Sequence, residues 1–266
     1  MSSSVMSPNA VSREEWMEAR QALLVREKAL TRQRDELSRA RRELPWVRVD
    51  TPYVFDTLDG PRTLGELFEG RSQLIVYHFM FGPGWKEGCV GCSLLADHLT
   101  GPLMHLAQHD VSLVVVSRAS LREIEPFRTR MGWTFNWVSS NRSDFNYDFH
   151  VSFRPEEIAN GRAYTNFGEH AIHSEETSGT SIFCKGAAGE VFHTYSSYSR
   201  GGEGYLGIYH LLDQTPKGRG ETDRGNLTDW VRHHDRYGAG GAVATSGRYQ
   251  PDAAAESGSC CKHEGR

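Results

Sequence analysis

The chain has 266 residues, which is enough for one sizeable hydrophobic core or for one domain with added segments. Its composition is that of a globular protein, and a net charge of -4 gives no sign of binding to nucleic acid or to an anionic membrane. No segment reaches the apolar length of a membrane-spanning helix, and the first residues lack the pattern of a signal peptide. We therefore expect a cytoplasmic protein without nucleic-acid or membrane partners.

The N-terminal part predicts a long helix. Residues 1–11 are expected to be disordered, and residues 12–44 to form a helical arm that begins with a capping box of Ser12 and Glu15. Apolar residues recur at every seventh position of this arm: Trp16, Leu23, Leu30, Leu37 and Leu44. Charged residues occupy the positions that would complete a coiled-coil seam. The narrow stripe favours one helix lying along a domain, with a homodimer through this helix as the alternative.

Between residues 45 and 237, segments with strand and helix patterns alternate, which predicts an α/β domain with a mixed sheet. Short apolar runs rich in β-branched residues predict buried strands at 74–80 and 111–117. A helix is expected at 92–108, interrupted at Gly101-Pro102. Other elements are expected as helices at 121–131, 204–212 and 227–234, a strand at 135–138, and a hairpin of strands 181–184 and 190–195.

The last residues, 238–266, are rich in Gly, Ala and Ser and are predicted to be a disordered tail. The tail contains Cys260 and Cys261, which could pass electrons or soft metal ions to another site or be incidental. Cys184 lies in a predicted strand and is most simply a small buried hydrophobic residue.

The most informative motif is the pair Cys89 and Cys92, separated by two residues. It follows the predicted strand at 74–80 and precedes a helical segment, so Cys89 lies at a strand-to-helix junction where backbone N–H groups and the helix dipole favour an anion. A cysteine in this position has a lowered pKa and reacts as a thiolate. We therefore predict Cys89 as the nucleophile and Cys92 as the resolving thiol, with Lys86 adding positive charge and Glu87 opposing it.

Two other uses of the pair remain open besides two buried structural thiols. A structural zinc site needs four ligands, and only the tail cysteines with His263 could complete it. Copper is the stronger alternative, because two thiolates and one imidazole suit this metal. Among several histidines, His173 is the first candidate for the third copper ligand, since it precedes the predicted strand at residue 181.

Several stretches carry a resemblance to a known family: residues 77–85, 88–92, 131–133, 137–140, 143–149, 191–196 and 215–219. On these stretches, between residues 12 and 237, the chain resembles the DUF899 family of predicted thiol–disulfide oxidoreductases. The resemblance implies a thioredoxin-like α/β fold, a mixed sheet flanked by helices, with the dithiol at Cys89 and Cys92.

Two departures narrow the expected activity. Residues 178–181 lack the proline that shapes the substrate groove of thioredoxins, which argues against protein disulfides as substrates. Peroxiredoxins carry a proline and a threonine where this chain has Gly82 and Lys86. The sequence therefore predicts a thiol–disulfide oxidoreductase that needs no cofactor, acts on a disulfide or small thiol and uses an unidentified reductant, with a copper protein as the alternative.

Overall fold

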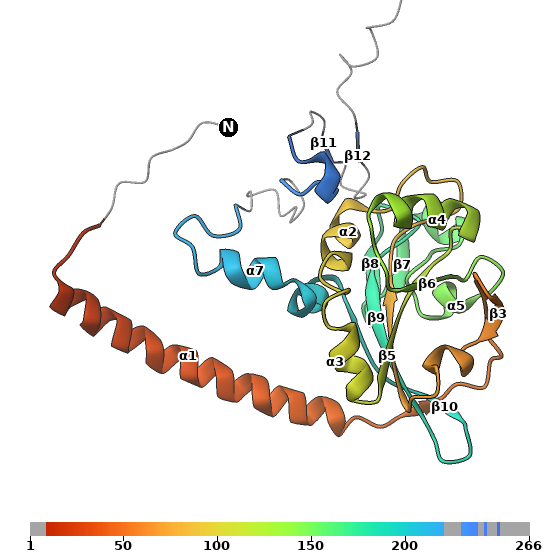
Figure 1. Ribbon diagram of the computed structural model, residues 1–266, viewed down its shortest axis with the longest axis horizontal. Coiled ribbons are helices and arrows are strands. Elements are labelled where there is room, and N and C mark those ends of the chain that lie inside the picture. Colours follow the sequence, from red (N-terminus) through yellow and green to blue (C-terminus); the bar gives the residue numbers. More distant parts are fainter. Residues whose placement is uncertain (1–8, 221–229, 239–241, 244–248, 251–266) are drawn as a thin grey trace, which may run out of the picture. The chain divides into compact units, whose positions relative to one another are not determined.

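The computed structural model describes residues 9–220, 230–238, 242–243 and 249–250 (Figure 1). The chain divides into two compact units, Met1–Pro45 and Trp46–Arg266. Most of the segments predicted to be disordered, including Cys260 and Cys261, lie outside the described residues. None of the helices formed by the described residues combines the length and hydrophobicity needed to span a bilayer.

The first unit contains helix α1 (Arg13–Arg42). Its capping box is formed as predicted: Ser12 Oγ accepts from the backbone N–H of Glu15 at 3.1 Å, and the Glu15 carboxylate accepts from the N–H of Ser12 at 2.9 Å. The five apolar residues of the stripe are exposed, and no residue of the helix is buried. Whether the stripe contacts a domain or a second copy of the chain stays a prediction.

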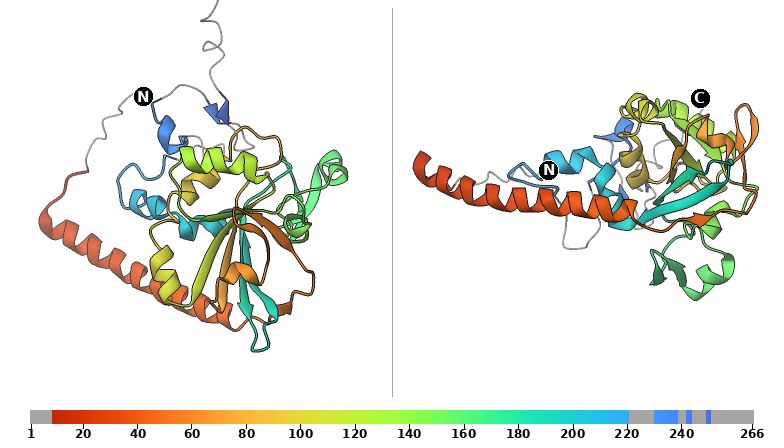
Figure 2. Two further views of the ribbon diagram at one scale, coloured as in Figure 1. Left: turned by 45° about the vertical axis from the view of Figure 1, so that its right-hand side comes forward. Right: turned by 90° about the horizontal axis from the view of Figure 1, so that it is seen from below.

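The second unit is built on an eight-stranded mixed sheet in the order β1-β10-β9-β4-β5-β6-β2-β3 (Figures 1 and 2). Its strands are β1 (Val47–Arg48), β2 (Val54–Thr57), β3 (Gly60–Thr63), β4 (Gln73–His78), β5 (Val111–Ser117), β6 (Asn136–Ser139), β9 (Gly179–Lys185) and β10 (Val191–Tyr198). Strands β4, β5 and β6 are parallel, and the predicted hairpin β9–β10 joins β4 in the antiparallel direction. The thioredoxin-like fold expected from the sequence is confirmed.

Helices cover the sheet, and most lie where the sequence predicts them. The α-helices of this unit are α2 (Val90–Ala96), α3 (Leu103–Gln108), α4 (Leu121–Arg130), α5 (Phe145–Asp148), α6 (Pro155–Asn160) and α7 (Gly207–Leu212). Short 3-10 helices are η1 (Glu66–Phe68), η2 (Ser199–Tyr205) and η3 (His234–Arg236). The predicted interruption at Gly101-Pro102 separates α2 from α3. Two hairpins, β7 (Arg162–Thr165) with β8 (Gly168–Ala171) and β11 (Ala242–Val243) with β12 (Tyr249–Gln250), were not expected.

One predicted helix is wrong in the part that the structure describes. Of the expected helix at 227–234, residues 230–233 are not helical, and only the 3-10 turn η3 follows. The backbone of His233 has φ −53° and ψ 138°, outside the helical region. The cause is tertiary, because the side chain of His233 is held by the carbonyl of Gly88 at 3.0 Å.

Two hydrophobic clusters pack on the sheet. The aromatic side chains of Trp133, Phe135 and Trp137 are buried in the cluster that also contains both cysteines of the motif, so they pack in the core beside them. The second cluster receives Phe145 of α5 and Phe149, which follows this helix. His78 of β4 stacks on Phe145 of this cluster, with its Nε2 2.9 Å from Ser181 Oγ, and burial lowers the pKa of His78 to about 3.

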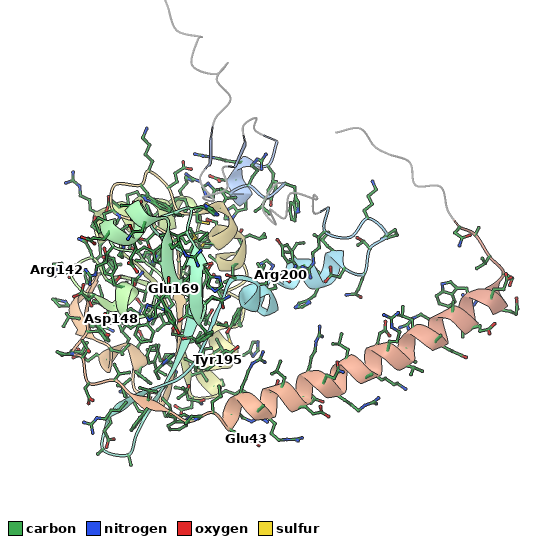
Figure 3. The ribbon with its side chains drawn as sticks, turned by 180° about the vertical axis from the view of Figure 1, so that it is seen from behind. Glu43, Arg142, Asp148, Glu169, Tyr195 and Arg200 are labelled. Atoms are coloured by element: carbon green, nitrogen blue, oxygen red, sulfur yellow. The ribbon has the colours of Figure 1, made fainter. Side chains whose placement is uncertain are left out.

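Two ion pairs of this unit differ in burial. Arg118, which follows β5, contacts Glu176 at 2.5 Å, and the two side chains are 15% and 1% exposed. Glu176 also accepts from Ser152 Oγ at 2.7 Å. By contrast, Arg142 is 70% exposed at the surface (Figure 3), where its Nε donates to Asp56 at 3.1 Å.

Candidate active site around Cys89 and Cys92

Cys89 is the N-cap residue of α2, as the strand-to-helix junction predicts. Its Sγ accepts a hydrogen bond from the backbone N–H of Cys92 at 3.4 Å. Its own N–H donates to the carbonyl of Met80 at 3.0 Å, and its carbonyl accepts from Ser93 Oγ at 2.8 Å. The thiol is therefore fixed at the first turn of the helix, where backbone donors are available.

Glycines allow the loop between β4 and α2 to lie close to the core. A Cβ placed at Gly88 would lie 2.4 Å from the Phe79 ring, a distance that no side chain tolerates. Gly84 has φ +78°, in the left-handed region that favours glycine. The loop consequently presses against the aromatic cluster just before Cys89, which positions the cysteine.

The two thiols differ in acidity. A hydrogen bond from the Cys92 thiol lowers the pKa of Cys89, and backbone N–H groups of Cys92 and Gly91 act in the same direction, whereas burial opposes them. Burial raises the pKa of Cys92 well above its usual value, and the interaction with Cys89 raises it further. Both thiols are free and buried, with 5% and 3% exposure. The pair therefore favours a thiolate at Cys89 that is hydrogen-bonded by a protonated Cys92.

Lys86 and His173 lie at the surface. Lys86 is exposed, and no hydrogen bond or ion pair joins it to another residue within the described part of the chain. His173 is exposed in the segment that precedes β9. Among residues that the structure describes, no three His, Cys, Asp or Glu side chains are grouped so that they could hold a metal ion. The role of Lys86 at the thiolate, and copper binding by the two cysteines with His173, stay predictions.

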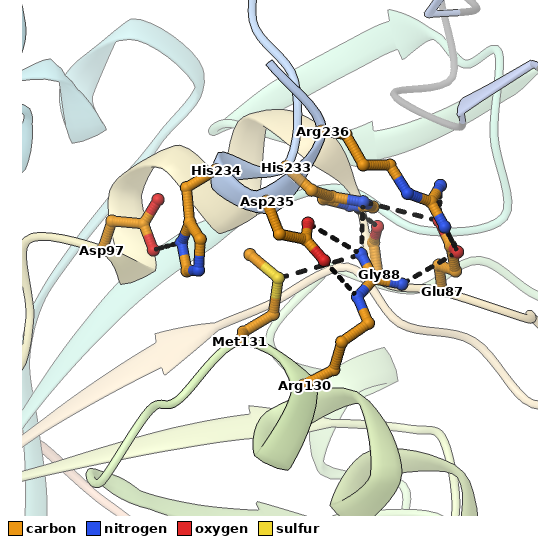
Figure 4. A network of polar contacts seen from close by, with 9 residues as sticks. All are labelled: Glu87, Gly88, Asp97, Arg130, Met131, His233, His234, Asp235 and Arg236. Atoms are coloured by element: carbon orange, nitrogen blue, oxygen red, sulfur yellow. Dashed lines mark hydrogen bonds and ion pairs between the residues drawn. The ribbon is translucent and has the colours of Figure 1, made fainter. Parts of the chain in front are cut away.

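A polar network that the sequence did not predict holds the cysteine loop (Figure 4). We call residues 230–238 the strap. His233 of the strap is buried, and its Nε2 is 3.0 Å from the carbonyl oxygen of Gly88, next to Cys89. Arg236 donates to Glu87 at 2.8 Å, and Arg130 of α4 contacts the same carboxylate at 2.9 Å. The charge of Glu87, which could oppose a thiolate, is thus paired with two guanidinium groups.

The strap is also attached to the helices beside the motif. Asp235 contacts Arg130 at 3.0 Å, and His234 contacts Asp97, which follows α2, at 2.8 Å. The only sequence signal was the dense polar run at 232–236, which carries no periodicity that would place it beside a loop far away in the chain. The sequence could therefore indicate a polar segment here but not its partner.

Cys92 also lines a cavity of about 130 Å³. Thr180, at the start of β9, belongs to the segment in which the sequence lacks the thioredoxin proline, and this segment also lines the cavity. Tyr77 of β4 is buried at the same place, where its hydroxyl donates to the carbonyl of Cys92 at 3.5 Å. The cavity therefore adjoins Cys92 and Tyr77.

The chain matches, over residues 5–237, the family described as "Bacterial protein of unknown function (DUF899)". It belongs to this family. The resemblance expected from the motifs is therefore confirmed, and both cysteines of the dithiol lie within the matched residues. No curated protein matches the DUF899 chain significantly.

Solved structures similar to this DUF899 protein include enzymes and an assembly protein. The peroxidoxin BcpB of Mycobacterium tuberculosis is 12% identical, with a TM-score of 0.42 over 64% of this chain and 97% of its own. A peroxiredoxin Q of Xanthomonas campestris is 13% identical, with a TM-score of 0.42 over 62% of this chain and 95% of its own. BsSco, a member of the Sco family of cytochrome c oxidase assembly proteins, is 17% identical, with a TM-score of 0.36 over 62% and 91%.

Proposed function

We propose that this DUF899 protein is a thiol–disulfide oxidoreductase whose dithiol is Cys89 and Cys92. The observation that carries the proposal is the asymmetry of the pair, since the pKa of Cys89 is lowered by a hydrogen bond from Cys92 while the pKa of Cys92 is raised by burial. A low-pKa thiol attacks, and a protonated thiol one helical turn away waits to resolve the intermediate. The two residues are thereby suited to different steps.

In the first step the Cys89 thiolate attacks one sulfur of a substrate disulfide. A bond forms between Cys89 and this sulfur, the substrate S–S bond breaks, and the second substrate sulfur leaves as a thiolate. In the second step Cys92 loses its proton to solvent and attacks the Cys89 sulfur. The first substrate sulfur then leaves, and the protein holds a Cys89–Cys92 disulfide, which an external dithiol reduces.

The proposal is tested by the reduction of hydroxyethyl disulfide with dithiothreitol as the reductant, above the rate of dithiothreitol alone. Cys89→Ser should abolish this turnover, because the attacking thiolate is gone. Cys184→Ser is the matched control and should keep the wild-type rate, since Cys184 lies on β9 outside the motif. Full activity of Cys89→Ser would overturn the proposal. Stoichiometric bound copper that is lost in His173→Ala would favour the copper alternative instead.

A further inference from the structure

The cavity beside the dithiol is lined mainly by apolar side chains. The apolar lining residues include Leu95 of α2, Leu206 and Tyr209, and the polar ones include Thr180 at the start of β9, Ser197 and Ser199. The thiol-bearing residue Cys92 is part of the lining. A ligand that enters this cavity therefore lies beside Cys92, in mostly apolar surroundings.

The size of the cavity limits the group that it holds. An apolar protein cavity of about 150 Å³ binds one benzene molecule, and the cavity here has about 130 Å³. It is thus suited to a single aromatic ring or a short branched alkyl group. The rest of a larger substrate would have to remain outside the cavity.

The charges at the cavity favour an uncharged ligand. Glu203 lines the cavity, and its carboxylate contacts Arg219 at 3.0 Å and Arg200 at 2.6 Å. These ion pairs compensate the negative charge of the carboxylate within the protein. Because an uncompensated charge in an apolar cavity is costly, an anionic substituent is disfavoured there.

We infer that the cavity holds the apolar substituent of a small-molecule disulfide, of about the size of one aromatic ring, and so places the disulfide sulfur at the Cys89–Cys92 pair. The inference rests on the proposed function and adds its substrate class. Cys89 is not itself part of the lining, but its Sγ lies 3.4 Å from the backbone nitrogen of the lining residue Cys92, which places the attacking thiol next to the cavity. The two exchange steps then release two equivalents of the apolar thiol, with the electrons supplied by the dithiol.

Two glycines of η2 provide a matched pair of variants. A Cβ placed at Gly202 meets only Leu95 Cδ1, at 3.8 Å, so Gly202→Leu fits the backbone and extends along the cavity wall. Gly204 is not part of the lining, and a Cβ there meets nothing within 4 Å. Gly204→Leu therefore adds the same side chain outside the cavity. Both glycines lack a positive φ, so leucine is not strained at either position.

The test is the single-turnover rate of the pre-reduced full chain with two disulfides, dithiodipyridine and hydroxyethyl disulfide. The rate of Cys89→Ser, which retains the other thiols, is subtracted from each rate. The difference is then divided by the rate at which free cysteine reacts with the same disulfide. The wild type and Gly204→Leu should prefer the aromatic disulfide by about tenfold or more, the range that one pocket-filling group supplies. Gly202→Leu should lose this preference.

The outcomes separate the inference from the proposed function. If Gly202→Leu and Gly204→Leu show the same preference while hydroxyethyl disulfide is still reduced through Cys89, the inference is overturned and the proposed function stands. If the wild type reacts with neither disulfide faster than Cys89→Ser, both are overturned. Methyl phenyl sulfide, which cannot be reduced, should slow alkylation of Cys92 in the wild type and in Gly204→Leu only. Equal protection of Gly202→Leu would overturn the assignment of the cavity.

Discussion

Replacing Cys92 isolates the interaction on which the proposed chemistry depends. Cys92→Ala removes the thiol whose hydrogen bond is the largest cause of the lowered pKa of Cys89. Cys92→Ser keeps a hydroxyl donor at the same position. Both variants keep the backbone N–H that lies 3.4 Å from Cys89 Sγ. The comparison therefore tests one side-chain hydrogen bond to a buried sulfur.

The magnitude follows from the burial of the acceptor. A hydrogen bond to a charged group contributes about 1.5–3 kcal/mol, and about 1.4 kcal/mol changes an ionisation equilibrium tenfold. Cys89 is only 5% exposed, so solvent does not replace the lost donor. At pH values below the midpoint of the rate profile, alkylation of Cys89 by iodoacetamide should be about tenfold slower in Cys92→Ala than in Cys92→Ser. The midpoint should move to higher pH in Cys92→Ala.

Mass spectrometry of the peptide that contains Cys89 gives the alkylation rate of this residue apart from the other cysteines. Superimposable pH profiles of the two variants would refute a role of the Cys92 thiol in stabilising the thiolate. A midpoint that moves to lower pH in Cys92→Ala would show that relief of burial outweighs the lost hydrogen bond.

The strap, the buried histidine and the buried ion pair each give one further prediction. Arg236→Ala removes a contact worth about 1 kcal/mol between the strap and the cysteine loop. A bulky maleimide should therefore label Cys89 about fivefold faster in this variant than in the wild type. An unchanged labelling rate would show that the strap does not limit access to Cys89. The pKa of His78 is about 3 in the folded chain and 6.5 without burial, so its contribution to stability is complete above pH 6.5 and is lost as the pH falls toward 3. His78→Asn should flatten the pH dependence of urea unfolding in this window by about 1.4 kcal/mol per pH unit, and an unaltered slope would contradict the assignment. Arg118→Ala should lower the free energy of unfolding by about 3–5 kcal/mol and the exposed Arg142→Ala by about 1 kcal/mol or less; equal losses in urea titrations would contradict the difference in burial.

Local patterns predicted the elements that position the dithiol. Three predicted features depend only on neighbouring residues, and the structure contains all three: the β-branched strand β4, the hairpin β9–β10 and the interruption at Gly101-Pro102. The position of Cys89 at the start of α2 follows from the same local signals. The sequence therefore indicated where Cys89 and Cys92 lie in the fold, while their roles as attacking and resolving thiols stay predictions.

Long-range contacts could not be read from the chain in the same way. His233 lies 145 positions after Gly88, and no periodicity connects the two. The cavity beside Cys92 is lined by residues of β9, η2 and α7, which are far apart in the sequence. These segments lie next to one another only in the folded chain. Tertiary contacts also overrode the helical pattern expected near His233. The non-helical backbone there accompanies the contact of the His233 side chain with the carbonyl of Gly88 in the cysteine loop.

The most direct test of the dithiol chemistry is to trap its intermediate. Cys92→Ser is mixed with hydroxyethyl disulfide without a reductant, and the peptides are analysed by mass spectrometry. The proposed steps predict a mixed disulfide on Cys89 in this variant and a Cys89–Cys92 disulfide in the wild type. Two results together would contradict the assignment of the attacking thiol. Cys92→Ser would carry no adduct on Cys89, and Cys89→Ser would acquire an adduct on Cys92 as fast as the wild type reacts with hydroxyethyl disulfide.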